Sequence, residues 1–189
     1  MQKTYQNKLT ITKSKSKLSG CYFVNFNKNI DHRGYFFNVL SKKLFLNKFP
    51  SRSIKQINLS ENKKKGTLRG LHFQAKPFSE SKIVICLKGR IFDVVLDLRK
   101  HSKTFGRHIS FELGEQKQKL VYIPKNCAHG FQTLVDNCIV MYLHLGDYVK
   151  THDFCVNPID QKLKIKWPIE KKIMSQRDLN AKNLNDHVL

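Results

Sequence analysis

Short runs of β-branched and aromatic residues, separated by turn residues, recur along most of the chain, whereas helical periodicity is scarce before its C-terminal part. The clearest pair is residues 82–87 and 90–98, which are joined by a Lys-Gly turn. In the second run alternate positions fall on opposite faces, which places Asp93 and Asp97 on the same face as Val95. This pattern predicts an all-β sandwich or barrel whose interior is partly polar.

The same reasoning extends to the rest of the chain. A strand interrupted by glycines is expected at 66–74, and further strands are expected at 20–25, 34–39, 53–59, 108–113, 120–123, 130–134 and 138–145. Short helical segments are expected at 37–49 and 169–184. We therefore expect residues 1–189 to form a single domain. Its antiparallel β core covers about residues 20–150, after a short N-terminal arm, and a partly helical tail covers about 151–189.

Cysteine spacing and hydropathy indicate the cellular compartment of the protein. Its five cysteines are odd in number and widely spaced, and no C-x-x-C pair is present, so neither a zinc knuckle nor a thioredoxin-type redox pair is indicated. The lysine-rich N-terminus lacks the apolar core of a secretory signal, and no apolar stretch reaches the length of a membrane span. We expect a cytoplasmic protein with free thiols and no membrane partner.

The formal net charge is +21, an excess that attracts polyanions such as nucleic acid or phosphorylated metabolites. The lysines are scattered along the whole chain and often accompany asparagine, a composition that also suits a genome biased toward lysine and asparagine codons. A basic helix, an RNP-type aromatic strand and a zinc finger are all missing from the sequence. A nucleic-acid partner is therefore not predicted, although a non-catalytic nucleic-acid-binding jelly roll remains a rival interpretation.

Three segments concentrate residues suited to chemistry. Residues 66–74 place Arg69, Gly70 and His72 in an otherwise apolar strand, and positions 69 and 72 point to opposite faces unless a bulge at Gly70 turns one of them. Residues 124–131 deliver His129 to the start of a strand, and residues 31–37 place an arginine beside a glycine and three aromatic residues.

Two histidines in a small barrel also raise the alternative of a metal-binding cupin. That class uses an H-x-H pair followed by a carboxylate, so that three ligands converge on one ion. Here Gln74 stands two residues after His72, and the next carboxylate is Glu80. A site of two histidines and one carboxylate remains open at this stage.

Taken together and in order, the segments resemble the dTDP-4-dehydrorhamnose 3,5-epimerase family. The resemblance runs from about residue 20 to residue 180 and rests on the motifs at 31–34, 68–74, 92–99, 104–106, 123–124, 128–131 and 165–168. It implies a homodimeric, cupin-like antiparallel jelly roll that works without a metal or other cofactor. Its substrate would be a nucleoside-diphosphate 4-keto-6-deoxy sugar.

The resemblance also implies a set of catalytic residues. A ketone at C4 acidifies the protons on C3 and C5, so inversion needs a base, enolate stabilisation and reprotonation from the other face. His72 matches the base, because an imidazole titrates near neutral pH, and Asp178 matches the carboxylate that fixes its tautomer. Lys82 matches the lysine beside the keto oxygen, and Tyr142 matches the tyrosine that returns the proton.

The remaining matches concern substrate binding. They are Arg33, Arg69, Gln56 and Asn58 at the nucleoside diphosphate, His129 at the sugar, Tyr148 stacked on the base, and Asn38, Asp153 and Arg177 nearby. The chain departs from the family at several neighbouring positions: Asn38 and Asp153 replace glutamates, Ile85 an arginine and Leu143 a lysine.

These departures keep narrower alternatives open. One is an epimerase acting at only one of C3 and C5, and another is an epimerase of a different keto sugar, such as a GDP-linked keto-heptose. A non-catalytic protein that binds sugar nucleotides is the rival from outside the enzymes.

Overall fold

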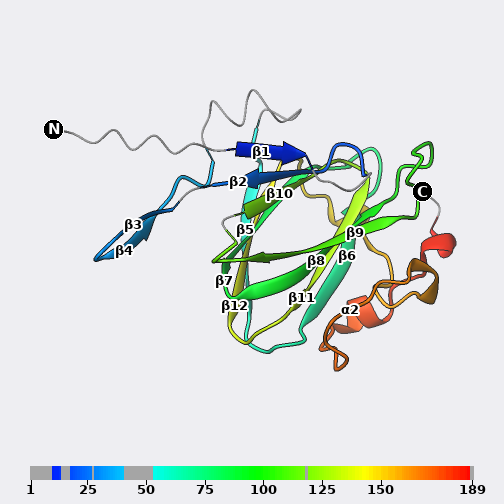
Figure 1. Cartoon of the computed structure of the whole chain (residues 1–189). Helices are drawn as coiled ribbons and strands as arrows, with labels where there is room; N and C mark the ends of the chain where they lie inside the picture. The colour runs from blue at the N-terminus through cyan, green and yellow to red at the C-terminus, as the bar shows by residue number, and fades with distance from the viewer. Residues whose placement is uncertain (1–9, 14–17, 27, 41–52, 118, 188–189) are drawn as a thin grey trace.

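The computed structural model describes residues 10–13, 18–26, 28–40, 53–117 and 119–187, and within them the chain forms two packed β-sheets and a projecting hairpin (Figure 1). The first sheet has the order β1 (Thr10–Lys13), β2 (Tyr22–Asn25), β10 (Lys119–Ile123), β7 (Lys82–Lys88), β12 (Cys138–His144), β5 (Gln56–Asn62). The second has the order β13 (Asp153–Cys155), β6 (Leu68–Gln74), β11 (Cys127–Thr133), β8 (Arg90–Asp97), β9 (His108–Gly114). The hairpin is formed by β3 (Asn29–Asp31) and β4 (Gly34–Phe36).

Neighbouring strands in both sheets and in the hairpin are antiparallel. This arrangement confirms the predicted all-β class and the antiparallel jelly roll. The predicted strands all reappear with boundaries shifted by a few residues, whereas β1, β3 and β13 were not predicted.

The main core lies between the two sheets. Val84 and Val140 of the first sheet pack in one cluster with Ile91 and Val95 of the second, and all four side chains are fully buried. Burying a side chain of this size contributes roughly 1.5–3 kcal/mol relative to leaving it exposed, so packing between the sheets stabilises the fold.

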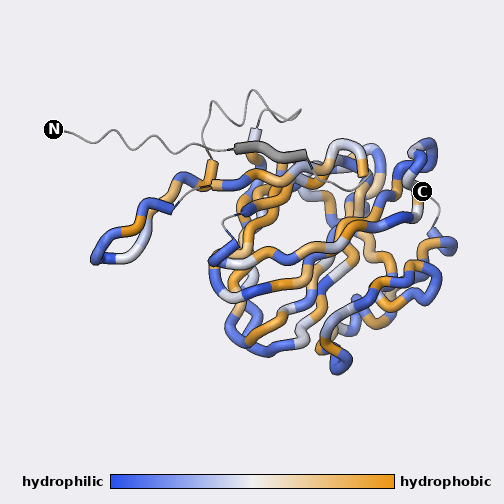
Figure 2. Tube along the Cα trace, in the orientation of Figure 1, coloured by the Kyte–Doolittle hydropathy of each residue, from blue (hydrophilic) through white to orange (hydrophobic). Residues whose placement is uncertain are grey.

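The alternation predicted for residues 90–98 is present in β8. Asp93 and Asp97 share the inward face and are fully buried, which confirms the partly polar interior. On the other face, Val94 and Leu96 pack in one cluster with C-terminal residues that include Val156. Hydrophobic and hydrophilic residues are interspersed along the strands (Figure 2).

The C-terminal tail is less helical than the sequence suggests. It contains the single helical turn α2 (Gln176–Leu179) and three 3-10 turns, η1 (Lys150–His152), η2 (Gln161–Leu163) and η3 (Leu184–Asp186). The short helical segment expected within 169–184 is confirmed by α2, whereas the residues that flank it are not α-helical. Ile173 and Lys182 instead form parallel bridges with Thr67 and Val156, and these bridges hold the backbone extended.

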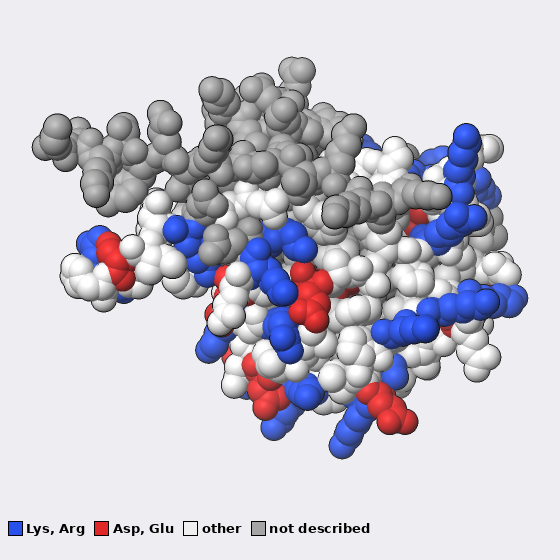
Figure 3. All heavy atoms as spheres, in the orientation of Figure 1, with Lys and Arg blue, Asp and Glu red and all other residues white. Residues whose placement is uncertain are grey.

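The second expected helix, over 37–49, lies largely outside the described residues, and residues 37–40 are not helical. Among the described residues no helix has the length and apolar character needed to cross a membrane. Lys and Arg side chains are distributed over several elements of the face seen in Figure 3, with acidic residues between them.

Candidate active site

A cavity of about 720 Å³ opens between the two sheets. Most of the residues predicted for the site contribute to its wall: Gln56, Asn58, Arg69, His72, Lys82, His129, Tyr142, Tyr148, Asp153 and Arg177. These side chains come from both sheets and from the C-terminal tail, so the fold brings together positions that are distant in the sequence.

A β-bulge lets Arg69 and His72 reach the same cavity. His72 pairs with His129 and Arg69 with Phe131, so two residues of β6 oppose the single residue Gly130 of β11. Gly70 has φ +116°, and a Cβ on it would lie 2.6 Å from the Gly130 Cα. The expected bulge is confirmed, and only glycine fits at its centre.

His72 is held by Asp178. Its Nε2 lies 2.7 Å from Asp178 Oδ1, and Asp178 stands in the first turn of α2, where the Ser175 hydroxyl accepts a hydrogen bond from its backbone N–H. Burial tends to raise the pKa of Asp178, but the hydrogen bond and charge of His72 outweigh it and hold that pKa below its ordinary value. The other ring nitrogen, Nδ1, makes no hydrogen bond to any described residue, and the imidazole is about one-third exposed.

His129 has a different setting. Its Nε2 lies 2.9 Å from Asp93 Oδ2, and both side chains are almost completely buried. Burial raises the pKa of Asp93 despite the opposing effect of His129. This buried pair fixes the ring of His129 at the cavity wall, where its centroid lies 6.0 Å from that of Tyr142.

Tyr142 lies on β12, on the wall formed by the first sheet, whereas His72 lies on the second. Its hydroxyl makes no hydrogen bond to any described residue. Burial, with a smaller contribution from the charge of Asp93, raises the pKa of Tyr142. The phenol is therefore protonated at neutral pH.

Lys82 belongs to a network of polar contacts with Glu80 and His144, which the sequence did not predict. Its Nζ lies 3.4 Å from Glu80 Oε1, His144 Nδ1 lies 2.8 Å from Glu80 Oε2, and His144 Nε2 lies 3.3 Å from the Asn58 amide nitrogen. Burial favours the neutral form of Glu80, but the hydrogen bond from His144 and the charge of Lys82 lower its pKa below the ordinary value. A sequence signal for His144 existed, because it stands two residues after Tyr142 on one strand and so shares its face.

Two hydrogen-bonded groups occupy the rim. The Arg177 guanidinium lies 2.9 Å from Asp153 Oδ2, and the Tyr148 hydroxyl donates to the same oxygen at 3.2 Å. Arg69 Nε donates to the Asn62 side chain at 2.7 Å. These contacts orient polar and aromatic groups around the opening.

Two predicted binding residues, Arg33 and Asn38, do not line the cavity. Arg33 lies in the turn between β3 and β4, where it forms an ion pair with Asp31 at 2.7 Å, and Asn38 is exposed just beyond the hairpin. Within this chain the hairpin projects away from the body that carries the cavity (Figure 1).

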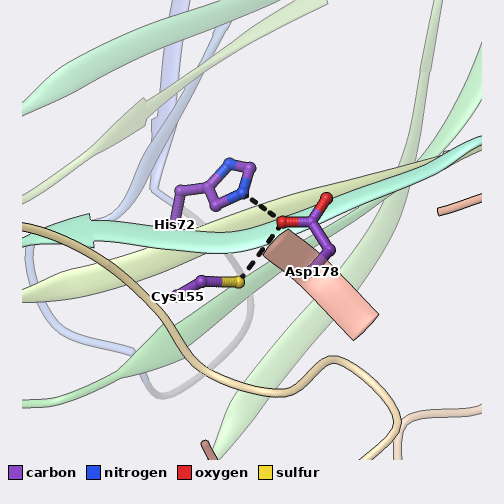
Figure 4. Close-up of side chains that lie close together, drawn as sticks. All are labelled: His72, Cys155 and Asp178. Carbon is purple, nitrogen blue, oxygen red and sulfur yellow. Dashed lines mark hydrogen bonds and ion pairs between the residues drawn. The ribbon is translucent and has the colours of Figure 1, made fainter. Parts of the chain in front are cut away.

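The site of two histidines and one carboxylate is not formed by the described residues. His72 and His129 are bound to different carboxylates, as given above, and His129 does not join a group of possible metal ligands. The described side chains that could converge on one ion are His72, Cys155 and Asp178 (Figure 4).

An imidazole held by a carboxylate therefore lies on one wall of the cavity, and a protonated phenol and a lysine side chain lie on the other. Such a set can remove a proton from a carbon acid on one side and return a proton on the other. An ammonium near the acceptor oxygen stabilises the anion formed between the two steps.

Comparison with known proteins agrees with this chemistry. Residues 15–186 match the family described as dTDP-4-dehydrorhamnose 3,5-epimerase. The enzyme of that name from Methanothermobacter thermautotrophicus is 35% identical over 177 residues, which are 92% of this chain and 94% of that protein.

Two solved structures are similar over most of their length. The Legionella pneumophila dTDP-6-deoxy-D-glucose-3,5-epimerase in complex with dTDP-4-keto-L-rhamnose has a TM-score of 0.86 and 30% identity, covering 93% of this chain and 94% of that one. A 3′-monoepimerase from Streptomyces bikiniensis in complex with dTDP-quinovose has a TM-score of 0.83 and 30% identity, covering 88% and 84%.

Proposed function

The chain belongs to the dTDP-4-dehydrorhamnose 3,5-epimerase family and is an isomerase of nucleotide sugars, and we propose that its cavity converts dTDP-4-dehydro-6-deoxyglucose to dTDP-4-dehydrorhamnose. The observation that carries this proposal is the placement of His72, fixed at 2.7 Å from Asp178, on the wall opposite Tyr142. Proton removal and proton return then occur on opposite faces of the sugar.

In the proposed reaction the ketone at C4 makes the hydrogens on C3 and C5 acidic. His72 Nδ1 takes one of these protons, and the electron pair of the broken C–H bond moves into an enolate whose charge rests on the C4 oxygen. Asp178 stabilises the resulting imidazolium through its contact with Nε2. Tyr142 then donates its phenolic proton to the carbon from the opposite face, which inverts the centre and leaves a phenolate. Solvent reprotonates this phenolate and takes the abstracted proton from the His72 imidazolium, which restores both groups.

Lys82 is assigned to the enolate oxygen. Its ammonium is buried in the cavity wall, where an ion–oxyanion contact is stronger than in water. Glu80 holds this ammonium from one side and is itself held by His144. The Glu80 carboxylate therefore fixes the Lys82 ammonium before substrate arrives, which is the preorganisation that electrostatic catalysis requires.

Nucleotide recognition is assigned to the opening of the cavity. Arg69 supplies a guanidinium for the diphosphate, Gln56 and Asn58 supply amides, and Tyr148, which is 57% exposed, offers a ring for stacking on the base. Arg177 and Asp153 form the polar rim around them.

A homodimer completes this proposal. The hairpin and the edge strand β5 expose Ile30, Phe36, Ile57 and Leu59, and apolar side chains gathered in this way on projecting or edge strands are typical of a surface that another chain covers. In such a dimer the hairpin of one copy delivers Arg33 to the cavity of its partner, which reconciles the predicted role of Arg33 with its position outside the cavity of its own chain.

Single-centre epimerisation is the second candidate, and the similarity to the 3′-monoepimerase favours it. Both candidates use the same base and acid, and they differ in whether the substrate can present C5 as well as C3 to His72.

One experiment tests both candidates. The protein is incubated in D2O with dTDP-4-keto-6-deoxyglucose, and deuterium at C3 and at C5 is followed separately by NMR. We expect incorporation with inversion at both centres. Incorporation at one centre identifies a monoepimerase. Absence of incorporation, together with saturable nucleotide binding, would instead identify a non-catalytic protein or another substrate.

A further inference from the structure

A thiol lies directly behind the base and its carboxylate. Cys155 is the last residue of β13 and pairs in register with His72 of β6. Its Sγ lies 3.5 Å from Asp178 Oδ1, the oxygen that is also 2.7 Å from His72 Nε2 (Figure 4). The three side chains come from separate segments of the chain and point toward one another.

Together these groups form a donor set that suits one kind of ion. One nitrogen, one sulfur and one carboxylate oxygen lie within 4.8 Å of one another. Zinc is bound in proteins by this combination of ligands, and three protein ligands leave a fourth position for water. The thiolate selects thiophilic cations over magnesium and calcium.

We propose that His72, Cys155 and Asp178 form an inhibitory site for Zn²⁺ or a similar thiophilic divalent cation. In a tetrahedral site the Zn–S and Zn–O distances of about 2.3 and 2.1 Å separate sulfur from oxygen by roughly 3.6 Å. The observed 3.5 Å between Cys155 Sγ and Asp178 Oδ1 already fits this separation. The 2.7 Å between His72 Nε2 and Asp178 Oδ1 must widen by about 0.7 Å. The separation of His72 Nε2 from Cys155 Sγ, which is within 4.8 Å, must come to about 3.6 Å, and side-chain rotations can provide both changes.

Charge and protons balance in this site. The ion binds Cys155 as a thiolate, so binding releases the thiol proton to solvent. The dication then meets one thiolate and one carboxylate, with a neutral imidazole as the third ligand. The resulting complex has no net charge, which removes the main penalty for burying it.

Both sides of the site are reachable. His72 borders the main cavity, whereas Cys155 borders a second cavity of about 440 Å³, which is also lined by Phe154, Lys182 and His187. The second cavity shares Asp153 and Arg177 with the rim of the main cavity, so an ion can reach the thiol from beside that rim.

Occupation of this site stops proton abstraction. A neutral imidazole that ligates through Nε2 carries its proton on Nδ1, so Nδ1 has no lone pair for the substrate. This inhibitory effect rests on the proposed role of His72, whereas binding of the ion does not.

The test separates binding from inhibition. Protein stripped of metal with a chelator is titrated with Co²⁺, whose thiolate complexes absorb in the near ultraviolet, and Zn²⁺ is then used to displace it. We expect a charge-transfer band that saturates at one equivalent, and loss of deuterium exchange at the same Zn²⁺ concentrations. Cys155→Ala and Cys155→Ser should lose the band and require at least about tenfold more Zn²⁺ for half-inhibition. The Ser variant keeps a hydroxyl donor for Asp178, and a circular-dichroism melt of each variant checks folding.

Cys138→Ala is the matched control, because Cys138 is also a buried free cysteine but belongs to the main core cluster. It should retain both the band and the sensitivity to Zn²⁺. Absence of the band in the wild-type protein, or equal half-inhibition in the wild type and Cys155→Ala, overturns the proposal. If the wild type shows no exchange on any substrate tested, the proposed function fails, and the Co²⁺ band still decides whether the ion binds.

Discussion

His72 and His129 are register partners on adjacent strands, yet each is held by a different carboxylate. Asp178 holds His72, which is 34% exposed, and Asp93 holds His129, which is 4% exposed. Exposure to the cavity suits a group that exchanges protons with substrate, whereas complete burial suits a group that shapes the wall. The two histidines therefore provide a matched pair of variants.

Replacing each histidine by asparagine should give opposite profiles. His72→Asn should reduce deuterium exchange at least about a hundredfold, because it removes the proposed base, with little effect on dTDP binding. Its cost in stability should be smaller than that of His129→Asn, because the Asp178 carboxylate keeps its contact with Cys155 Sγ. His129→Asn leaves Asp93 buried without its partner and should cost about 3 kcal/mol in unfolding free energy, with a smaller loss of exchange. Exchange, calorimetric dTDP binding and urea unfolding are measured for both. Retention of more than about a hundredth of wild-type exchange by a folded His72→Asn variant removes His72 from the role of base.

Metal removal should leave the reaction intact. The proposed base, acid and enolate stabiliser are all side chains of this chain, so no step requires a bound ion. We expect the exchange rate to be unchanged, or to rise if Zn²⁺ was bound by His72, Cys155 and Asp178, after exhaustive dialysis against EDTA. Elemental analysis of the dialysed protein accompanies the assay. A loss of activity that a divalent ion restores contradicts the proposed mechanism.

The dimer proposal predicts complementation between two inactive variants. If Arg33 acts in the partner's cavity, an Arg33→Ala chain paired with a His72→Asn chain contains one complete site and one doubly defective site. Random co-expression should then recover about a quarter of wild-type activity, because about half of the dimers are mixed and each has one working site. Recovery no greater than the average of the two pure variants indicates that Arg33 acts within its own chain or not at all.

Asp97 should control stability in acid. Its carboxylate accepts hydrogen bonds from Arg99, Ser102 and Thr104, and although burial opposes them these contacts lower its pKa to about 2. A carboxylate with a depressed folded-state pKa contributes stability that is complete above its unfolded pKa and is lost as pH falls through the folded value. This contribution is about 2 kcal/mol and disappears between about pH 4 and pH 2.

The measurement is urea unfolding of the wild type and Asp97→Asn across this range. The difference in unfolding free energy should be largest near neutral pH and shrink as pH falls from about 4 toward 2. Asp147→Asn is the control, because the Asp147 side chain is exposed and makes a long surface pair with Lys55, so the change should stay below about 0.5 kcal/mol. A gap between wild type and Asp97→Asn that is independent of pH contradicts the assignment.

Whether a feature of this protein can be predicted from its sequence depends on how far apart in the sequence the interacting residues lie. The alternation in β8 and the glycine bulge at Gly70 are local patterns, and both are confirmed. Contact between His72 and Asp178 joins residues 106 positions apart, and only the family resemblance suggested it.

Other parts of the site follow from packing alone. The Glu80 carboxylate gains its role from His144, which lies 64 positions away in the sequence, and no local pattern signals that pairing. The sequence likewise does not distinguish Cys155 from the other cysteines, and only the pairing of β13 with β6 places it beside His72. The short helical segment expected within 169–184 is limited to the four residues of α2, because Ile173 and Lys182 on either side bridge to distant segments.

The last prediction separates proton removal from proton return. Tyr142→Phe keeps the ring and its packing near His129 and deletes only the hydroxyl, which makes no hydrogen bond to any described residue. His72, Asp178 and Lys82 remain, so the C–H bond can still break and deuterium can still enter from the side of His72.

What should fail is delivery of a proton from the opposite wall. The enolate is then reprotonated on the face from which the proton was removed, so exchange proceeds without inversion. The ratio of inversion to exchange should therefore fall at least about tenfold. Both quantities come from one NMR time course in D2O, with Tyr148→Phe as a control that changes a rim tyrosine instead. A water molecule in the space of the lost hydroxyl can return some protons, which would reduce the effect without removing it. An unchanged ratio in a folded Tyr142→Phe variant means that Tyr142 only packs the wall, and the acid must then be another group that reaches the face opposite His72.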